Sequence, residues 1–316
     1  MGSRAVEEAV QGTDRADASK GEDGPAAGAQ AEPPLSAGLY LVATPIGNAA
    51  DVTLRALGTL RRAAAIACED TRTTAKLLAV HGISRPLLSY HEHNATLAGP
   101  AILARLVAGE AIALVSDAGT PLVSDPGYRL VRACVDAGLP VVPVPGPSAV
   151  LAALSVSGLP TDRFLFAGFP PPRQAARHRF LEGLANVDAT LVMLESPQRL
   201  AASLADMADV MGAREAAVCR ELTKLFEETR RATLPVLARH YEEAGAPKGE
   251  VTLVIAAPAP AEALSDAEVD ALLAEALEAG ETVRTAAERI ADASGRPRRE
   301  VYARALAGRR SRGGGA

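Results

Sequence analysis

Short apolar runs alternate with amphipathic stretches from Leu39 onward, and this alternation limits the fold more than any other feature of the sequence. The first series of expected strands covers 39–44, 64–68, 86–90, 111–116 and 140–144. The expected helices cover 51–62, 71–80, 95–108, 127–137 and 147–156. Strands that alternate with helices in this way predict an α/β fold with a largely parallel sheet covered by helices.

A turn-rich segment at 157–162 interrupts the series, and the alternation then resumes. The second series has expected strands at 163–169, 190–195, 215–220 and 249–257, and expected helices at 174–186, 198–211 and 234–244. The chain of 316 residues is long enough for two cores. The sequence therefore predicts two α/β domains, over 38–157 and 158–258.

The two ends of the chain differ in charge from the middle. Residues 1–37 hold three basic and seven acidic side chains and almost no large apolar ones, so we expect a disordered acidic leader. After a proline-alanine linker at 257–263, residues 264–310 read as a helical extension with a helix-turn-helix rhythm, with Ser265 as a helix cap. Residues 294–316 carry seven arginines against Glu300 alone. This segment either binds nucleic acid or packs on the body of the protein or on a partner subunit.

Residues 137–161 carry no charge, but five prolines interrupt them, so we expect a buried strand, a turn and a buried helix in place of a membrane span. The three cysteines are scattered, without a C-x-x-C pair. His91 and His93 lack a third ligand at metal spacing. We therefore expect a cytoplasmic protein with no disulfide framework, no metal site and no contact with a membrane.

Small and charged residues follow several of the expected strands, at the edge where open α/β sheets bind ligands. The first strand ends in "TPIGN" and lacks the G-x-G-x-x-G of a dinucleotide site. In "SDAGTPLVSDPG" (116–127), Asp117 is available to a ligand, whereas Asp125 is expected to cap the next helix. Ser148 either caps its helix or faces the same ligand, and either Asp70 or Thr71 caps the helix at 71–80.

In order along the chain, "TPIGN", "EDTRTT", "HEHN", "SDAGTPLVSDPG", "PGPSA", "GLPTDRF", "RELTK" and "KGE" resemble the ribosomal RNA small subunit methyltransferase I family of the tetrapyrrole-methylase superfamily. The resemblance runs from about Leu39 to Ile255 and extends to the helical tail, while the leader lies outside it. It implies S-adenosylmethionine as cofactor, bound between two α/β domains. The residues that it places at the cofactor are Pro45, Ile46, Asp117, Gly119, Thr120, Ser148, Ala149, Leu194 and Gly249.

The implied reaction is methylation of a cytidine ribose 2′-hydroxyl in the decoding region of small-subunit rRNA. The implied partners are the assembled small ribosomal subunit, which the basic tail favours as substrate, and a second copy of the chain in a homodimer. A ribose hydroxyl is a poor acid, so a nearby base or cation should help it lose its proton. The candidates for this role are Glu69, Asp70, Arg72, Lys224, Lys248 and Glu250, of which Lys248 and Glu69 are the first to substitute.

Two alternatives remain open. A small-molecule methylase of the same superfamily, acting on a tetrapyrrole, would have the same cleft, but it would not need the basic tail and should carry a shorter G-D-P loop. A nucleic-acid-binding module that acts through its C-terminal helices would leave the patterned loops at the strand ends unexplained.

Overall fold

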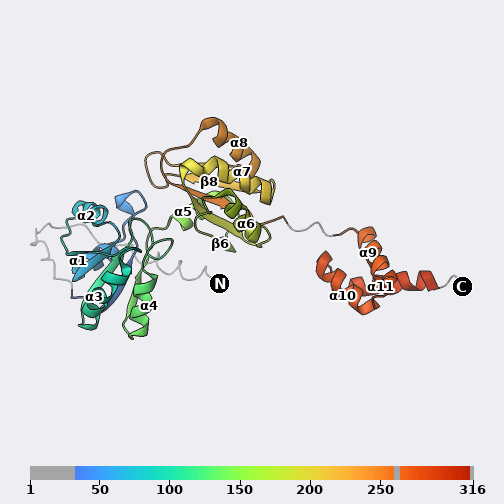
Figure 1. The fold of residues 1–316 in the computed structure, drawn as a ribbon, viewed down its shortest axis with the longest axis horizontal. Helices are drawn as coiled ribbons and strands as arrows, with labels where there is room; N and C mark the ends of the chain where they lie inside the picture. The colour runs from blue at the N-terminus through green and yellow to red at the C-terminus, as the bar shows by residue number, and fades with distance from the viewer. Residues whose placement is uncertain (1–32, 260–263, 314–316) are drawn as a thin grey trace, which may run out of the picture. The chain divides into compact units, whose positions relative to one another are not determined.

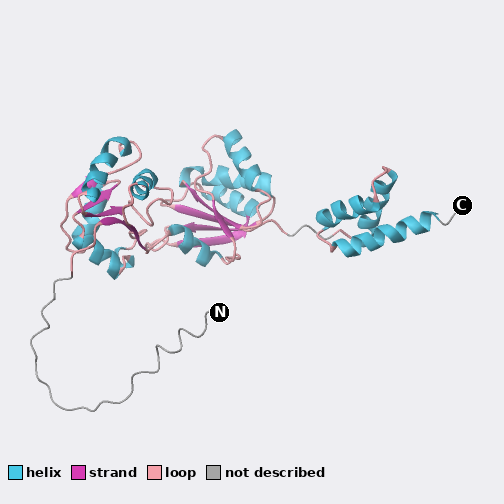
Figure 2. Cartoon of the chain, turned by 90° about the horizontal axis from the view of Figure 1, so that it is seen from below, coloured by secondary structure: helices cyan, strands magenta, loops and turns pink. Residues whose placement is uncertain are grey.

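The computed structural model describes residues 33–259 and 264–313, the last five of them by backbone alone. The predicted leader falls mostly outside this range, and so does part of the proline-alanine linker. Figure 1 traces the elements in chain order, and Figure 2 distinguishes strands from helices.

The first sheet has five parallel strands in the order β3-β2-β4-β1-β5. They are β1 (Gly38–Val42), β2 (Ala65–Cys68), β3 (Leu87–Ser89), β4 (Ala111–Val115) and β5 (Val141–Val144). Leu39 of β1 lies opposite Ile112 of β4 and Val141 of β5. Every residue of β2 and β4 is buried, as expected of parallel strands covered on both faces. The prediction of a parallel sheet is confirmed for this half.

Four helices and one short 3-10 turn connect these strands. They are η1 (Ala49–Asp51), α1 (Leu54–Arg62), α2 (Thr71–Val80), α3 (Ala95–Val107) and α4 (Tyr128–Asp136). Leu106 of α3 and Leu130 of α4 pack with Leu39 and Ile112 in one core. α2 begins where predicted, because the Asp70 carboxylate accepts a hydrogen bond of 2.8 Å from the backbone N–H of Arg72.

The start of α4 corrects one prediction. The residue before α4 is Gly127, whose φ of 140° suits glycine, and no side chain caps the helix. The carboxyl group of Asp125 instead lies near Ser116, which lowers its pKa. The prediction that Asp125 caps this helix is therefore wrong, and its side chain is free for another role.

The second sheet also has five strands, in the order β6-β7-β10-β8-β9. They are β6 (Phe164–Phe166), β7 (Thr190–Glu195), β8 (Glu215–Arg220), β9 (Glu228–Thr233) and β10 (Val251–Ile255). Only β6 and β7 are parallel, since β10 runs antiparallel between β7 and β8, and β8 and β9 form an antiparallel pair. The expectation of a largely parallel sheet is wrong for this half.

Helices cover both faces of the second sheet. η2 (Pro197–Arg199) and the helices α6 (Gln174–Leu184), α7 (Leu200–Met211) and α8 (Leu234–Ala244) follow its strands. Leu181, Leu204 and Leu237 of these helices pack with Leu191 and Met193 of β7. Between α6 and α7, the buried Arg177 Nε donates a 2.6 Å hydrogen bond to Asp206 Oδ2.

The opposite face of this sheet is covered by α5 (Ala149–Ser157), although α5 follows β5 of the first sheet in the chain. Val150 and Leu154 of α5 pack with Val192 of β7 and Val254 of β10. Ile46, from the loop after β1, belongs to the same cluster. Besides a core of its own, each half therefore contributes residues to this shared cluster.

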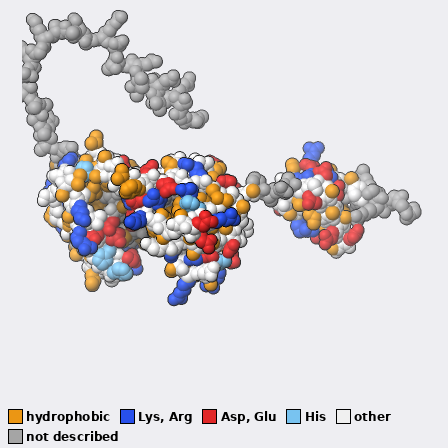
Figure 3. Space-filling model, turned by 90° about the horizontal axis from the view of Figure 1, so that it is seen from above, with side chains coloured by type: hydrophobic (Ala, Val, Ile, Leu, Met, Phe, Trp, Pro, Cys, Tyr) orange, Lys and Arg blue, Asp and Glu red, His pale blue; other side chains and the backbone are white. Residues whose placement is uncertain are grey.

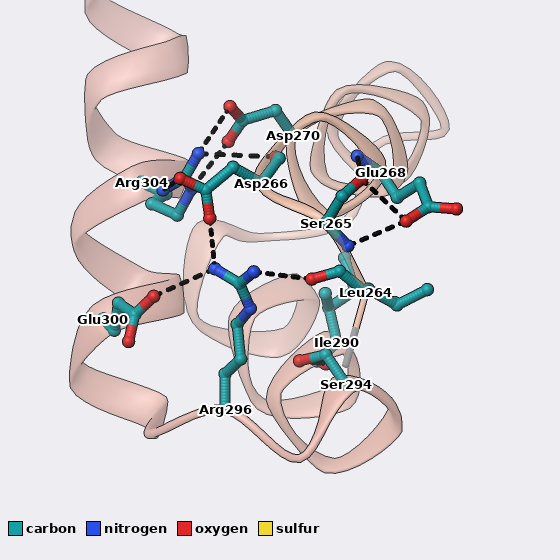
Figure 4. A network of polar contacts seen from close by, with 10 residues as sticks. All are labelled: Leu264, Ser265, Asp266, Glu268, Asp270, Ile290, Ser294, Arg296, Glu300 and Arg304. Carbon is teal, nitrogen blue, oxygen red and sulfur yellow. Dashed lines mark hydrogen bonds and ion pairs between the residues drawn. The ribbon is translucent and has the colours of Figure 1, made fainter. Parts of the chain in front are cut away.

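Three helices follow the linker: α9 (Asp266–Glu278), α10 (Val283–Ser294) and α11 (Arg298–Gly313). The predicted cap is confirmed, since Ser265 and Glu268 form a capping box. Figure 4 shows that Arg296 and Arg304 connect the start of α9 with α11. Arg304 lies 2.9 Å from the carboxylates of Asp266 and Asp270, and Arg296 lies 3.0 Å from Glu300. Some of the arginines of the tail thus stabilise the fold of the tail itself.

The uncharged stretch at 137–161 forms a strand, a turn and a helix, as predicted. The expected burial is only partly confirmed, because β5 is an edge strand in which Val144 alone is buried, and α5 is buried on one side. Among the helices of the described residues, none combines the length and the apolar character that crossing a membrane requires. Cys68, Cys134 and Cys219 are buried and free.

Candidate functional site

The loops after β1 and β4 meet at the carboxyl edge of the first sheet, where these two strands are neighbours. Thr44 and Gly119 exchange two backbone hydrogen bonds of 2.9 and 3.0 Å, and the Thr44 hydroxyl donates to the carbonyl of Ser116 at 3.1 Å. Gly119 has a φ of 77°, which favours glycine. α1 and α4 leave this edge in different directions, and such a point is where open α/β sheets hold ligands.

A cavity of about 440 Å³, which we call the cleft, opens beside these loops. The first half lines it with Ile46, Asp117, Thr120 and Asp125, among others. The second half contributes residues from the ends of β7 and β10, including Leu194 and Thr252. Its size lies in the range of roughly 300–1,000 Å³ that is usual for small-molecule sites.

Eight of the nine predicted cofactor residues line the cleft: Ile46, Asp117, Gly119, Thr120, Ser148, Ala149, Leu194 and Gly249. The ninth, Pro45, lines a smaller cavity beside it. Ser148 also caps α5, because its Oγ accepts a hydrogen bond from the backbone N–H of Leu151. The two roles that the sequence left open for Ser148 are thus compatible.

The wall formed by the β4 loop is acidic. Burial, together with the nearby carboxylates of Glu69 and Asp117, raises the pKa of Asp125 to about 6, although a hydrogen bond with Ser116 lowers it. Burial and the charge of Asp117 likewise raise the pKa of Glu69. Asp117 Oδ1 is held in place by a 3.0 Å hydrogen bond from the backbone N–H of Asp70. The negative charge on this wall favours a cationic ligand group.

The smaller cavity, about 270 Å³ and here called the side cavity, shares Ile46, Asp117 and Glu250 with the cleft. Lys224 lines it, and its Nζ donates to Glu221 Oε1 at 2.7 Å and to Glu250 Oε2 at 3.0 Å. Partial burial disfavours the ammonium, but these two carboxylates outweigh it and raise the pKa of Lys224. Lys224 is therefore a cation at neutral pH.

Two glycines leave space for this group of charges. A Cβ at Gly47 would lie 2.4 Å from Lys224 Cγ, and a Cβ at Gly249 would lie 2.2 Å from the carboxyl carbon of Glu221. Glu221 and Thr223 have left-handed backbone conformations, with φ of 50° and 67°. Such strained residues persist where the surrounding structure fixes them, and they are frequent at functional sites.

The structure does not bring the six proposed catalytic residues together. Lys224 and Glu250 line the side cavity. Arg72 forms two hydrogen bonds of 3.1 and 2.8 Å with the Asp70 carboxylate and is largely exposed. Glu69, Asp70 and Arg72 line neither the cleft nor the side cavity. Lys248 lines a separate groove on the second half.

Two residues of this site were missed by sequence reasoning. Asp125 was assigned to a helix cap, and only the burial of its loop reveals it as part of the cleft wall. Glu221 lies within the quoted motif "RELTK", three residues before Lys224, at a spacing that suits an ion pair. That spacing was the available signal.

Comparisons with known proteins identify the family of the chain. The family model "Tetrapyrrole (Corrin/Porphyrin) Methylases" matches residues 38–238, and "RsmI C-terminal HTH domain" matches residues 263–309. Proteins named ribosomal RNA small subunit methyltransferase I from Mesorhizobium japonicum and Erythrobacter litoralis are 54% and 52% identical to the chain. Each alignment covers 86% of this chain, and 92% and 96% of the respective relative.

Among solved structures, a diphthine synthase matches with a TM-score of 0.56 at 15% identity, over 69% of this chain and 89% of that one. A likeness at this identity supports the fold alone. The family models and the relatives carry the assignment: the chain belongs to the ribosomal RNA small subunit methyltransferase I family of the tetrapyrrole methylases.

Proposed function

We propose that this chain transfers the methyl group of S-adenosylmethionine to the ribose 2′-hydroxyl of a cytidine in the decoding region of small-subunit rRNA. The names of its relatives support rRNA as the substrate class. The observation that carries the chemistry is the hydrogen-bonded Lys224 in a side cavity that shares residues with the cleft.

The residues of the cleft fit this cofactor. Ile46, Ala149 and Leu194 offer apolar surface to the adenosyl group, while Asp117 and Asp125 offer negative charge to the sulfonium and amino groups. When bound, S-adenosylmethionine supplies an electrophilic methyl group on a positively charged sulfur. The cleft would fix that methyl group facing the side cavity, and alignment of the two reactants supplies much of the rate.

Lys224 and Glu250 would act on the ribose hydroxyl in the side cavity. A lysine ammonium has three N–H donors, and the carboxylates of Glu221 and Glu250 take two of them. The third is available to the 2′-oxygen, where it stabilises the charge that develops as the proton leaves. The Glu250 carboxylate, beside Lys224 and in both cavities, is placed to accept that proton.

We further propose that the enzyme is a cytoplasmic homodimer and that its substrate is the assembled small subunit. Light scattering of the purified protein tests the dimer. Parallel assays on free rRNA and on subunits test the substrate, and preferential methylation of free rRNA would contradict this part of the proposal.

The central experiment measures methyl transfer from labelled S-adenosylmethionine to small subunits from a strain that lacks this gene, followed by mapping of the labelled nucleotide. We expect the label on one decoding-region cytidine ribose. Lys224→Ala should lower the rate about 100-fold or more, with cofactor affinity unchanged. Absence of label on subunits and rRNA, with cofactor still bound, would refute the proposed substrate and favour a small-molecule methylase.

A further inference from the structure

A groove of about 500 Å³ lies on the second half and is not explained by the cleft. Its lining includes Arg220, Arg230, Lys248, Phe226 and Tyr241. The loop between β8 and β9, at 221–227, lines both this groove and the side cavity. On one side of this loop Lys224 faces the side cavity, and on the other side Phe226 faces the groove.

The segment 247–250 is divided in the same way. Lys248 lines the groove, while Glu250 lines the side cavity and the cleft. The carbonyl oxygen of Lys248 accepts a 3.1 Å hydrogen bond from Arg220, which fixes the segment to the end of β8. The groove and the proposed reaction site are therefore two faces of the same pair of loops.

The groove has an excess of positive charge. Arg220 and Arg230 share one carboxylate, that of Glu228, at 3.2 and 2.8 Å. Lys248 forms no ion pair with any residue that the structure describes. Three cations thus face one acidic side chain, a balance that suits a phosphate group. On the face of the second half drawn in Figure 3, basic side chains lie among hydrophobic and acidic ones.

The groove also has an exposed aromatic ring. Phe226 is 67% exposed, and its neighbour Leu225 is 89% exposed. Exposed aromatic rings beside cations are the usual platforms on which single-stranded nucleic acid stacks its bases. Nothing in the packing of the second half requires these side chains, because the core beneath consists of other residues.

We infer that this groove binds a nucleotide adjacent to the target in the RNA strand, an inference that rests on the proposed function. The base stacks on Phe226, and the phosphate contacts Lys248 and Arg220. Phe226 follows Lys224 by two residues, so their Cα atoms lie at most about 7 Å apart. One or two nucleotides span this distance, so a flanking nucleotide held in the groove would place the target ribose at Lys224.

The ion pairs of the C-terminal helices support the assignment of a phosphate contact to the groove. Arg296 and Arg304 are engaged with acidic residues of the same helices, and Arg298 lies 3.2 Å from Asp292. These arginines are therefore partly neutralised within their own fold, whereas Lys248 is not. The groove offers its cations on the same loops that line the proposed reaction site.

The test is direct binding of a fluorescein-labelled single-stranded RNA of decoding-region sequence to the full chain, measured by anisotropy at several salt concentrations. We expect Phe226→Ala to weaken binding about tenfold or more, and Phe226→Trp to retain it. Lys248→Ala should reduce the slope of log K against log salt by about 0.7. Leu97→Ala and Arg85→Ala, exposed residues away from the groove, serve as controls.

Unchanged affinity and salt slope in the groove variants would overturn the inference, and so would a loss equal to that in the controls. A change in oligomeric state in Phe226→Ala, without a change in RNA affinity, would assign the groove to a second copy of the chain and would equally overturn it. Since binding is read without methyl transfer, failure of the groove is distinguishable from failure of the proposed reaction.

Discussion

Replacement of Gly47 by alanine should inactivate the enzyme through Lys224 alone. The added Cβ would lie 2.4 Å from Cγ and 2.8 Å from Cε of Lys224, distances that real Cβ atoms do not show. The backbone at Gly47 is not in the left-handed region, so alanine introduces no backbone strain there. The lysine side chain is the flexible partner and must move, which breaks its hydrogen bonds to Glu221 and Glu250.

The expected magnitudes separate activity from stability. Loss of one preorganised donor from a reaction site costs about 100- to 1,000-fold in kcat, or about 2.7–4 kcal/mol of transition-state stabilisation. The two ion pairs are partly exposed, so their loss should change the free energy of unfolding by no more than about 1 kcal/mol. Cofactor affinity should stay the same, because neither Gly47 nor Lys224 lines the cleft.

Single-turnover methyl transfer, urea unfolding and calorimetry with S-adenosylmethionine measure the three quantities. Gly183→Ala in α6 is the matched control, since its Cβ meets nothing within 4 Å and alanine favours the helix. In a Lys224→Ala background, Gly47→Ala should cost nothing more. Wild-type turnover of Gly47→Ala, or an additional loss in the double variant, would refute the reasoning.

Three further predictions concern charge. Asp125 has a pKa of about 6 in the folded protein, above its ordinary pKa of 3.8, so the folded state binds this proton more tightly than the unfolded state does. The stability of the wild type to urea should therefore fall, relative to that of Asp125→Asn, as the pH rises from about 4 to 6. Parallel pH profiles of the two proteins would contradict this. Asp206→Ala leaves Arg177 buried without its partner and should lower the free energy of unfolding by about 3–5 kcal/mol in the same assay. Arg296 lowers the pKa of Asp266, so the stabilising effect of this ion pair is present above pH 3.8 and is lost at lower pH. Asp266→Asn should therefore speed hydrogen exchange in the C-terminal helices at pH 7. Unchanged exchange would argue against a stabilising role of the ion pairs of Asp266.

Much of the fold could be predicted because its strands are apolar and its helices begin at recognisable caps. β7, β8, α2 and α8 have the predicted bounds, and Asp70 and Ser265 are the caps that fix two of the helices. β9 was missed because "ETRRAT" has no apolar alternation, and it tolerates charge as an edge strand. The antiparallel position of β10 was missed because the pattern of apolar residues along a strand does not show which strands it pairs with, or in which direction.

The site was predictable to the extent that its residues lie in short motifs. The resemblance predicted eight of the residues that line the cleft. It did not predict that Gly47 lies against Lys224, because no local pattern links positions so far apart in the sequence. The raised pKa of Asp125 depends on burial, which the motif "SDPG" does not reveal. Long-range contacts and burial depend on the whole fold, so they could not be predicted from short motifs.

The position of α5 has a mechanical consequence. This helix begins at the cleft wall with Ser148 and Ala149, and its apolar side is embedded against β7 and β10 together with Ile46. Ile46, which comes from the first half, is buried in this packing, so a hinge that opened the cleft by moving the two halves apart would have to expose Ile46 to water. The cleft should therefore admit its ligand through movement of its surface loops, while the buried floor of the cleft keeps the same conformation.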